Sequence, residues 1–146
     1  MFLGQFYHNL DNKGRLTIPA RFRDLLSADG AYIMLGFDQN LMVLPSPTFQ
    51  TLSQRIKQMS MTNPDTRVLR RLIFSSANYV EIDKAGRVLL PQFLRKSTNI
   101  ESAAVVIGSG DFFEIWSPDS WATQADQLRD SELNAHRFEA LDLTSI

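Results

Sequence analysis

Cationic side chains gather around two short glycine-containing segments of the sequence, and these side chains are suited to contacts with a polyanion. The segments read Asp11-Asn-Lys-Gly-Arg15 and Asp83-Lys-Ala-Gly-Arg87. An arginine can grip guanine O6 and N7 through two parallel hydrogen bonds, whereas a lysine is a flexible point charge that suits a phosphate. The candidate DNA-binding residues are Lys13, Arg15, Arg21, Arg23, Lys84 and Arg87.

Two of these cations also have a structural interpretation. Arg15 can pair with Asp11 and hold the turn between them, and Lys13 can be an ordinary solvated lysine. The doubling of the segment favours a functional role for Arg15. Because the second segment has Ala85 in the position of Lys13, we expect the first segment to contribute more to DNA binding.

Arg21 and Arg23 follow the first segment in a stretch that we expect to be helical, where they can extend the same positive surface. Arg23 recurs after the second segment as Arg95. For Arg95 we favour a structural ion pair with Asp83 or Asp11 over a contact with DNA.

The residues that enzymes and metal sites require are scarce in this sequence. Cysteine is absent, and neither His8 nor His136 is accompanied by another histidine as a metal ligand. No Gly-x-Ser-x-Gly elbow is present, and Gly108-Ser-Gly-Asp111 lacks the Lys-Ser/Thr ending of a phosphate loop. We therefore predict no enzyme activity, no metal or other cofactor and no small-molecule substrate.

The net charge of −1 averages two unlike regions. Residues 1–110 carry 13 basic and eight acidic side chains, a balance of +5, whereas residues 111–146 carry two bases and eight acids, a balance of −6. This asymmetry indicates polyanion binding at the basic end, although a solvated basic face gives the same pattern. No apolar run approaches the ~20 residues of a membrane helix, and the N-terminal residues do not form a secretory signal. We expect a soluble cytoplasmic protein that does not bind a membrane.

The sequence contains an internal repeat with a constant offset of 72 residues. Residues 7–23 align without a gap on residues 79–95, and the register continues from 31–36 onto 103–108. Six positions of the first alignment are identical: Tyr7/Tyr79, Asp11/Asp83, Gly14/Gly86, Arg15/Arg87, Pro19/Pro91 and Arg23/Arg95. One structural unit therefore occurs twice. Since a unit of roughly 50–60 residues is marginal alone, we expect the two copies to pack together.

Each copy has the pattern of strands, a turn and helices. A short strand at 5–10 or 77–82 leads into the glycine-containing segment, which predicts a tight hairpin turn with glycine at positive φ. The returning strand, 15–18 or 87–90, ends at a proline that fits the first turn of a short helix. Two further strands and an amphipathic helix follow: 31–37, 41–44 and a helix from Ser46 or Pro47, and 103–108, 112–116 and a helix capped by Ser117.

The two copies are connected by a further predicted helix, which begins at Asn63-Pro64. After about Ser131 the chain turns polar and acidic, and we expect this end to be frayed or exchanged with a neighbouring chain. Short repeats with unpaired strand edges also favour self-association.

The pattern Asp-x-Lys-Gly-Arg-(x)3-Pro-(x)3-Arg runs from Asp11 to Arg23 and, in degenerate form, from Asp83 to Arg95. It resembles the MraZ family, and the resemblance covers nearly the whole chain. The resemblance implies an α+β fold of two tandem, pseudo-symmetric SpoVT-AbrB-like β units, each a swapped hairpin with flanking helices. The corresponding divisions are a first domain at 5–47, connecting helices at 48–75, a second domain at 76–119, and a C-terminal helix with an acidic tail at 120–146.

The same resemblance implies a bacterial transcriptional regulator that binds double-stranded DNA at promoter repeats of the division and cell-wall gene cluster. It also implies a homo-oligomer closed into a ring, located in the cytoplasm and associated with the nucleoid. From the residues alone two other classes stay open. One is an oligomeric interaction module that does not bind DNA, and the other is an antitoxin-like regulator of the AbrB type.

Overall fold

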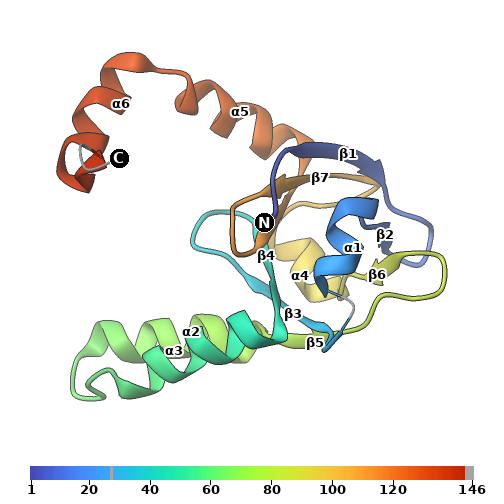
Figure 1. The fold of residues 1–146 in the computed structure, drawn as a ribbon, viewed down its shortest axis with the longest axis horizontal. Helices are drawn as coiled ribbons and strands as arrows, with labels where there is room; N and C mark the ends of the chain where they lie inside the picture. The colour runs from blue at the N-terminus through green and yellow to red at the C-terminus, as the bar shows by residue number, and fades with distance from the viewer. Residues whose placement is uncertain (27, 144–146) are drawn as a thin grey trace.

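The computed structural model describes residues 1–26 and 28–143, and it consists of a sheet body with two helical arms (Figure 1). The first copy forms β1 (Gln5–Asn9), β2 (Arg15–Thr17), α1 (Ala20–Leu26), β3 (Ala31–Leu35), β4 (Leu41–Pro45) and α2 (Ser46–Gln58). The second copy forms β5 (Asn78–Val80), β6 (Arg87–Leu89), α4 (Gln92–Ser97), β7 (Ala103–Gly108), β8 (Phe113–Trp116) and α5 (Pro118–Leu128). The remaining elements are α3 (Pro64–Ser76), α6 (Ser131–Phe138) and the 3-10 helix η1 (Glu139–Leu141).

Equivalent elements of the two copies begin 72 residues apart, as β2 and β6, α1 and α4, β3 and β7, β4 and β8, and α2 and α5 all do. The repeat in the sequence is therefore a repeat in the structure. The predicted strand pairs of each copy are present as β3–β4 and β7–β8. The predicted α+β architecture of tandem, pseudo-symmetric units is confirmed.

The two copies are interleaved, because four strand pairs join one copy to the other. β1 pairs with β7, β5 pairs with β3, β4 pairs with β8, and β2 pairs with β6. The sequence pattern predicts a simple hairpin across each glycine turn. The turns are present, but the prediction that the strands on either side pair with each other is wrong. After one bridge between Leu10 and Leu16, β1 and β2 part and join different sheets. The result is a six-stranded antiparallel sheet, in the order β1-β7-β8-β4-β3-β5, and a separate two-stranded ribbon of β2 and β6.

One hydrophobic core serves both copies and explains why the strands part. Equivalent residues of the two copies pack in the same cluster: Leu16 with Val88, Ile18 with Leu90, and Phe22 with Leu94. Burial of apolar surface is the main favourable term in folding, and one copy alone would leave its half of this cluster in water. The exchange of strands therefore lets two small units share one core.

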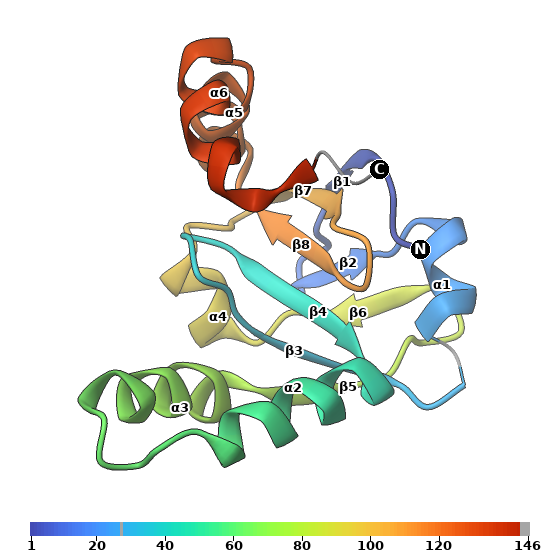
Figure 2. The same cartoon turned by 60° about the vertical axis from the view of Figure 1, so that its left-hand side comes forward.

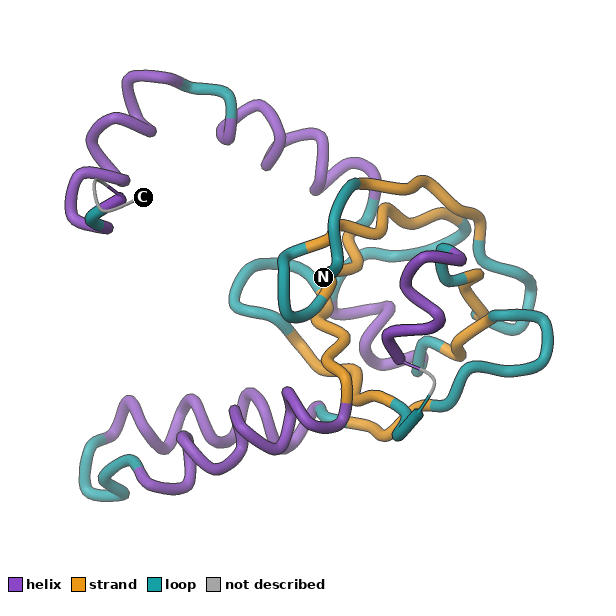
Figure 3. Tube along the Cα trace, viewed as in Figure 1, coloured by secondary structure: helices purple, strands orange, loops and turns teal. Residues whose placement is uncertain are grey.

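The first arm is the hairpin of α2 and α3, which extends from the sheet on the same side as the second arm in Figure 1. Phe49, Ile56 and Ile73 pack in one cluster with residues of β3 and β4 at the base of this arm. Asn63 caps α3 by accepting the backbone N–H of Asp65, as the Asn-Pro signal predicts. Figure 3 shows the two helices running side by side.

The second arm consists of α5, α6 and η1, and it lies apart from the first arm in both views (Figures 1 and 2). Trp121 of α5 packs beside Val105 and Trp116 of the body, and Ser117 caps the helix as predicted. The composition after Ser131 predicts an end that is frayed or exchanged with a neighbouring chain. Residues 131–138 are not frayed, because they form α6, capped by Asp130. No residue of α6 is buried.

Gly14 provides a test of the packing between the copies. It has a φ of +80°, and a Cβ at this position would lie 2.7 Å from Cζ of Arg95 in the other copy. We expect Gly14→Ala to lower the free energy of unfolding by about 2–3 kcal/mol, because left-handed backbone costs an alanine roughly 1–2 kcal/mol and Arg95 must also move. The measurement is urea denaturation at a fixed protein concentration.

Gly110→Ala is the matched control, since Gly110 has a φ of +83° but open space where a Cβ would stand. Gly110→Ala should lower the free energy of unfolding by about 1–2 kcal/mol, which is the cost of left-handed backbone alone. Equal losses for the two variants would contradict the close packing of Arg95 on Gly14.

Candidate nucleic-acid interface

β2 and β6 form a short antiparallel ribbon whose two faces differ in polarity. Its three cross-strand pairs are Arg15–Leu89, Leu16–Val88 and Thr17–Arg87. The central pair is turned to the core, with Leu16 and Val88 only 0% and 1% exposed. Side chains alternate between the faces of a strand. The outward face therefore carries Arg15, Thr17, Arg87 and Leu89.

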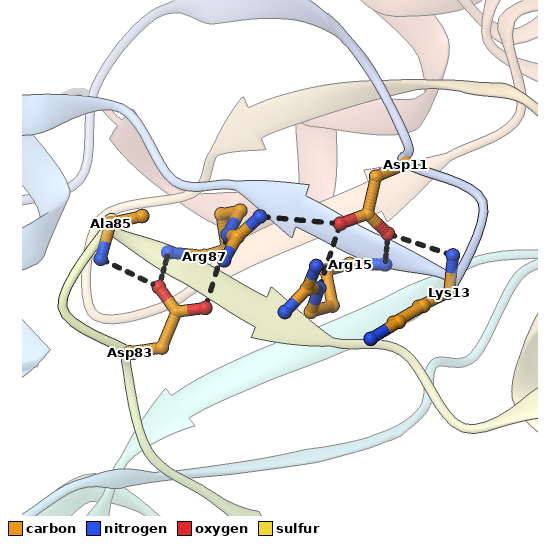
Figure 4. A network of polar contacts seen from close by, with 6 residues as sticks. All are labelled: Asp11, Lys13, Arg15, Asp83, Ala85 and Arg87. Carbon is orange, nitrogen blue, oxygen red and sulfur yellow. Dashed lines mark hydrogen bonds and ion pairs between the residues drawn. The ribbon is translucent and has the colours of Figure 1, made fainter.

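Asp11 holds the turn before β2 and orients the arginine that follows it (Figure 4). One oxygen of its carboxylate accepts the backbone N–H groups of Lys13 and Arg15, at 3.0 and 2.9 Å. The other oxygen accepts hydrogen bonds from Nε of Arg15, at 2.7 Å, and from Nη1 of Arg87, at 3.4 Å. The same carboxylate thus fixes the turn and both guanidinium groups.

Asp83 repeats this arrangement before β6. It accepts the backbone N–H groups of Ala85 and Arg87 at 2.9 Å each, and Nε of Arg87 at 3.1 Å. Gly86 completes the turn with a φ of +78°, and its carbonyl accepts the N–H of Ile18 from the other copy. The second turn is therefore tied to the first copy as well as to its own strand.

Anchoring through Nε leaves the outer edge of each guanidinium available to a ligand. The terminal nitrogens of Arg15 and Nη2 of Arg87 donate to no residue in the described part of the chain. The side chains of Arg15 and Arg87 are 29% and 31% exposed. An arginine already held in one geometry loses less entropy when a ligand binds its remaining nitrogens. The two interpretations of Arg15, as partner of Asp11 and as ligand contact, are thus compatible.

Three other predicted cations lie at the surface of the body. Lys13 and Lys84 are exposed, one on each turn beside the ribbon. They are not at equivalent positions, because the second turn has Ala85 where the first has Lys13. Arg21 is exposed on α1, and no hydrogen bond or ion pair among the described residues connects it to the ribbon.

Arg23 and Arg95 brace the turns from within the fold. Nε of Arg23 donates to the carbonyl of Ile18 at 2.8 Å, and its guanidinium lies against Gly86. Arg95 mirrors this contact, with Nε donating to the carbonyl of Leu90 at 2.9 Å. The ion pair that we expected between Arg95 and Asp83 or Asp11 is not among the ion pairs of the described residues. Each arginine instead supports the turn of the other copy.

Thr17 and Leu89 share the outward face with the arginines, although neither residue type marks a candidate contact with a polyanion. They occupy equivalent positions of the repeat. Each stands two residues after an arginine, so strand alternation alone places it on the same face as that arginine. The missing information was the pairing of β2 with β6, which brings all four side chains together.

Other features of the described residues do not form a comparable site. His8 lies on β1 and His136 on α6, and within residues 1–26 and 28–143 no cluster of three or more metal-ligating side chains is found. A cleft of about 510 Å³ beside α2 is lined by residues that include Phe112 and Glu114. Burial raises the pKa of Glu114, whose carboxylate accepts Nε1 of Trp116 at 2.9 Å. In the described part of the chain, no helix has both the length and the apolarity to cross a membrane.

Comparison with known proteins matches both copies to one family. The sequence profile described as "MraZ protein, putative antitoxin-like" matches residues 1–72 and again residues 73–143. The chain belongs to the MraZ family. A "Transcriptional regulator MraZ" of Thermomicrobium roseum is 44% identical over 88% of this chain and 89% of its own length. A protein of the same name from Herpetosiphon aurantiacus is 46% identical over 89% of this chain and 90% of its own length. Another, from Clostridium tetani, is 36% identical over 98% of this chain and 100% of its own length.

Membership of the MraZ family confirms the resemblance that the doubled motif indicated. The two matched halves meet between residues 72 and 73, inside α3, so this helix joins the copies. The names of the relatives identify this MraZ chain as a transcriptional regulator, which is not a class of enzyme.

Acid should loosen the turn before β2. The backbone N–H of Arg15, together with its guanidinium, lowers the pKa of Asp11 to about 2. Because this pKa is depressed below the unfolded value of ~3.9, the carboxylate stabilises the fold above about pH 4, and its contribution is lost as the pH falls from about 4 to about 2. We expect Asp11→Asn to flatten the loss of stability in that window, measured by urea unfolding at a series of pH values.

Asp126→Asn is the control, since Asp126 lies in an exposed pair with Arg129 that measures 4.0 Å. This variant should keep the acid dependence of the parent protein. An unchanged acid dependence in Asp11→Asn would show that the carboxylate does not anchor the turn.

Proposed function

We propose that this MraZ chain is a sequence-selective regulator that binds double-stranded DNA through the β2–β6 ribbon. The proposal is carried by the outward face of the ribbon, where Asp11 and Asp83 hold two arginines through Nε. A two-stranded ribbon fits the major groove of B-DNA, which is ~12 Å wide. In this geometry Arg15 and Arg87 grip the edges of guanines.

The neighbouring cations complete the proposed surface. Lys13 and Lys84, exposed on the two turns, neutralise phosphates on either side of the groove. Arg21 adds a phosphate contact from α1. Arg23 contributes through the turn that it braces.

A single ribbon offers few contacts, so useful affinity requires several ribbons on one DNA. Each neutralised phosphate contributes a salt slope near −0.9, and linked sites gain avidity when their spacing matches the DNA. We infer a closed ring of chains whose ribbons meet successive promoter repeats of the division and cell-wall gene cluster, in the cytoplasm and on the nucleoid. The family resemblance supports the cluster and the ring.

The charges of the two arms support head-to-tail assembly of such a ring. Residues 46–76, with α2 and α3, carry five basic side chains and one acid, a balance of +4. Residues 118–143, with α5, α6 and η1, carry two bases and six acids, a balance of −4. The acidic arm of one chain therefore complements the basic arm of the next. A contact between two different surfaces repeats around a ring, whereas a two-fold dimer uses the same surface twice.

The acidic arm also needs a partner for physical reasons. α6 spans eight residues and buries none of them, and isolated helices shorter than ~12–15 residues are marginal in water. Leu133, Phe138 and Leu141 of this arm are all more than 40% exposed. Docking on a neighbouring chain would remove their apolar surface from water.

Arg15→Ala should lose base selectivity, because a bidentate arginine–guanine pair discriminates by about 1–3 kcal/mol. We expect at least a roughly five-fold fall in the affinity ratio between the promoter upstream of the chain's own gene and an unrelated duplex. Lys13→Ala should weaken both duplexes about equally and lower the salt slope by about one. Both effects are measured by fluorescence anisotropy over a salt series.

The control is Arg129→Ala, which removes an exposed arginine of the acidic arm and should change neither quantity. Retained selectivity in Arg15→Ala would refute the assignment of the site. If the parent protein bound no DNA at low salt while keeping its oligomer, the interaction module would be the better description.

Charge reversal tests the proposed contact between arms. A basic-arm variant, with Arg55, Lys57 and Arg71 changed to glutamate, presents two acidic arms. An acidic-arm variant, with Asp126, Glu132 and Glu139 changed to lysine, presents two basic arms. Each alone should lose the oligomer, and an equimolar mixture should recover it, because every contact in the mixture again joins opposite charges.

The readout is the molar mass from size-exclusion chromatography with light scattering, with circular dichroism to confirm folding of each variant. All six residues are exposed, so the folds should persist. An unchanged mass in both separate variants would place the contact between chains elsewhere.

A further inference from the structure

We infer that Leu89 contacts the methyl group of a thymine and thereby gives the ribbon a fixed direction along the DNA. This inference rests on the proposed binding of DNA by β2 and β6. It concerns a residue beyond the six candidate contacts, and the chemistry that it adds is apolar.

Leu89 is a large apolar side chain within a cationic surface. It lies opposite Arg15 in the ribbon and is 53% exposed, whereas the central pair of the ribbon is buried. Its exposed surface therefore does not serve the core of the described chain. A ligand that covers it gains about 25 cal/mol for each Å² of apolar surface removed from water.

The repeat shows that Leu89 breaks the symmetry of the ribbon. Its equivalent in the first copy is Thr17. The register pairs Arg15 with Leu89 and Arg87 with Thr17. The two arginines are equivalent in the repeat, but their cross-strand neighbours differ. One end of the ribbon presents an arginine next to a leucine, and the other end presents an arginine next to a threonine.

Thymine is the base that an exposed leucine recognises in the major groove. Its 5-methyl group is the apolar feature on the base edges, while the other edges carry nitrogen and oxygen donors or acceptors. Leucine offers no hydrogen bond, so it leaves a polar base edge unpaired when it covers one. A threonine has both a hydroxyl and a methyl group and contacts either kind of edge. Thus only the leucine end requires a thymine.

A ribbon with two equal ends would bind a palindromic site equally in both orientations. The ends of this ribbon also differ in their turns, where Lys13 stands at the leucine end and Ala85 at the threonine end. The ribbon therefore selects a thymine beside the guanine of Arg15 and not beside the guanine of Arg87.

Replacement of thymine by deoxyuridine tests the inference, since it removes the methyl group alone. Each thymine in the promoter duplex upstream of the chain's own gene is replaced in turn, and affinity is measured for the full-length protein. The parent protein should lose about four-fold at one thymine of each bound repeat, as expected for one buried methyl-sized group. Leu89→Thr should bind the thymine and uracil duplexes equally at that position.

Thr17→Leu is the reciprocal variant and should acquire a second uracil-sensitive position at the other end of each repeat. Indifference of the parent protein to uracil, or equal losses in the parent protein and Leu89→Thr, would overturn the inference. The inference would also be overturned if Leu89→Thr changed the mass of the oligomer but lost as much affinity on uracil replacement as the parent protein. Leu89 would then serve a contact between chains. The proposed function fails separately, if the parent protein binds no DNA or Arg15→Ala keeps its selectivity.

The direction of the ribbon is measured independently. The sequence contains no cysteine, so Ala85→Cys provides a single attachment point for an iron chelate that cleaves nearby DNA. Ala85 lies on the turn at the threonine end. Cleavage should fall on one side of each repeat, and equal cleavage on both sides would overturn the inferred direction.

Discussion

The antiparallel pairing of β2 with β6 is the contact on which both the fold and the candidate site depend. It joins the two copies of the repeat, turns Leu16 and Val88 into one shared core, and brings the equivalent arginines onto one outward face. A single copy would have half of the core and one arginine of the pair. Duplication within one chain supplies the partner strand at a high effective concentration, so the ribbon does not depend on the association of two molecules.

Asp11 and Asp83 link the geometry of this ribbon to its electrostatics. Each carboxylate accepts hydrogen bonds from its own turn and from a guanidinium, so the arginine and the backbone that carries it are fixed together. The same carboxylates offset part of the positive charge that would attract DNA. In the proposed DNA complex, single contacts therefore contribute through their geometry more than through bulk attraction. In the proposed complex, selectivity comes from oriented arginines, and affinity comes from the number of ribbons that act together.

Local chemistry was enough to predict the repeat, the glycine turns, and the helix starts at Asn63 and Ser117. The role of Arg15 in DNA binding stays a prediction. The strand partners were not predictable in this way, because the exchange between copies depends on a core shared by residues 72 positions apart. The partners of Arg95 were missed for a related reason: its Nε donates to a backbone carbonyl, which no sequence spacing identifies. Leu89 became recognisable only when the register placed it beside Arg15.

Membership of the MraZ family identifies the chain as a transcriptional regulator, and the ribbon is the chemical basis that we propose for that role. The most direct measurement of this basis replaces single guanines of the bound promoter duplex by 7-deazaguanine, which lacks the N7 acceptor. If Arg15 grips a guanine edge, the parent protein loses roughly ten-fold or more in affinity at that guanine, because a hydrogen bond to a charged group contributes about 1.5–3 kcal/mol. Arg15→Ala is then indifferent to the same replacement. Equal sensitivity of the two proteins at every guanine would contradict the account.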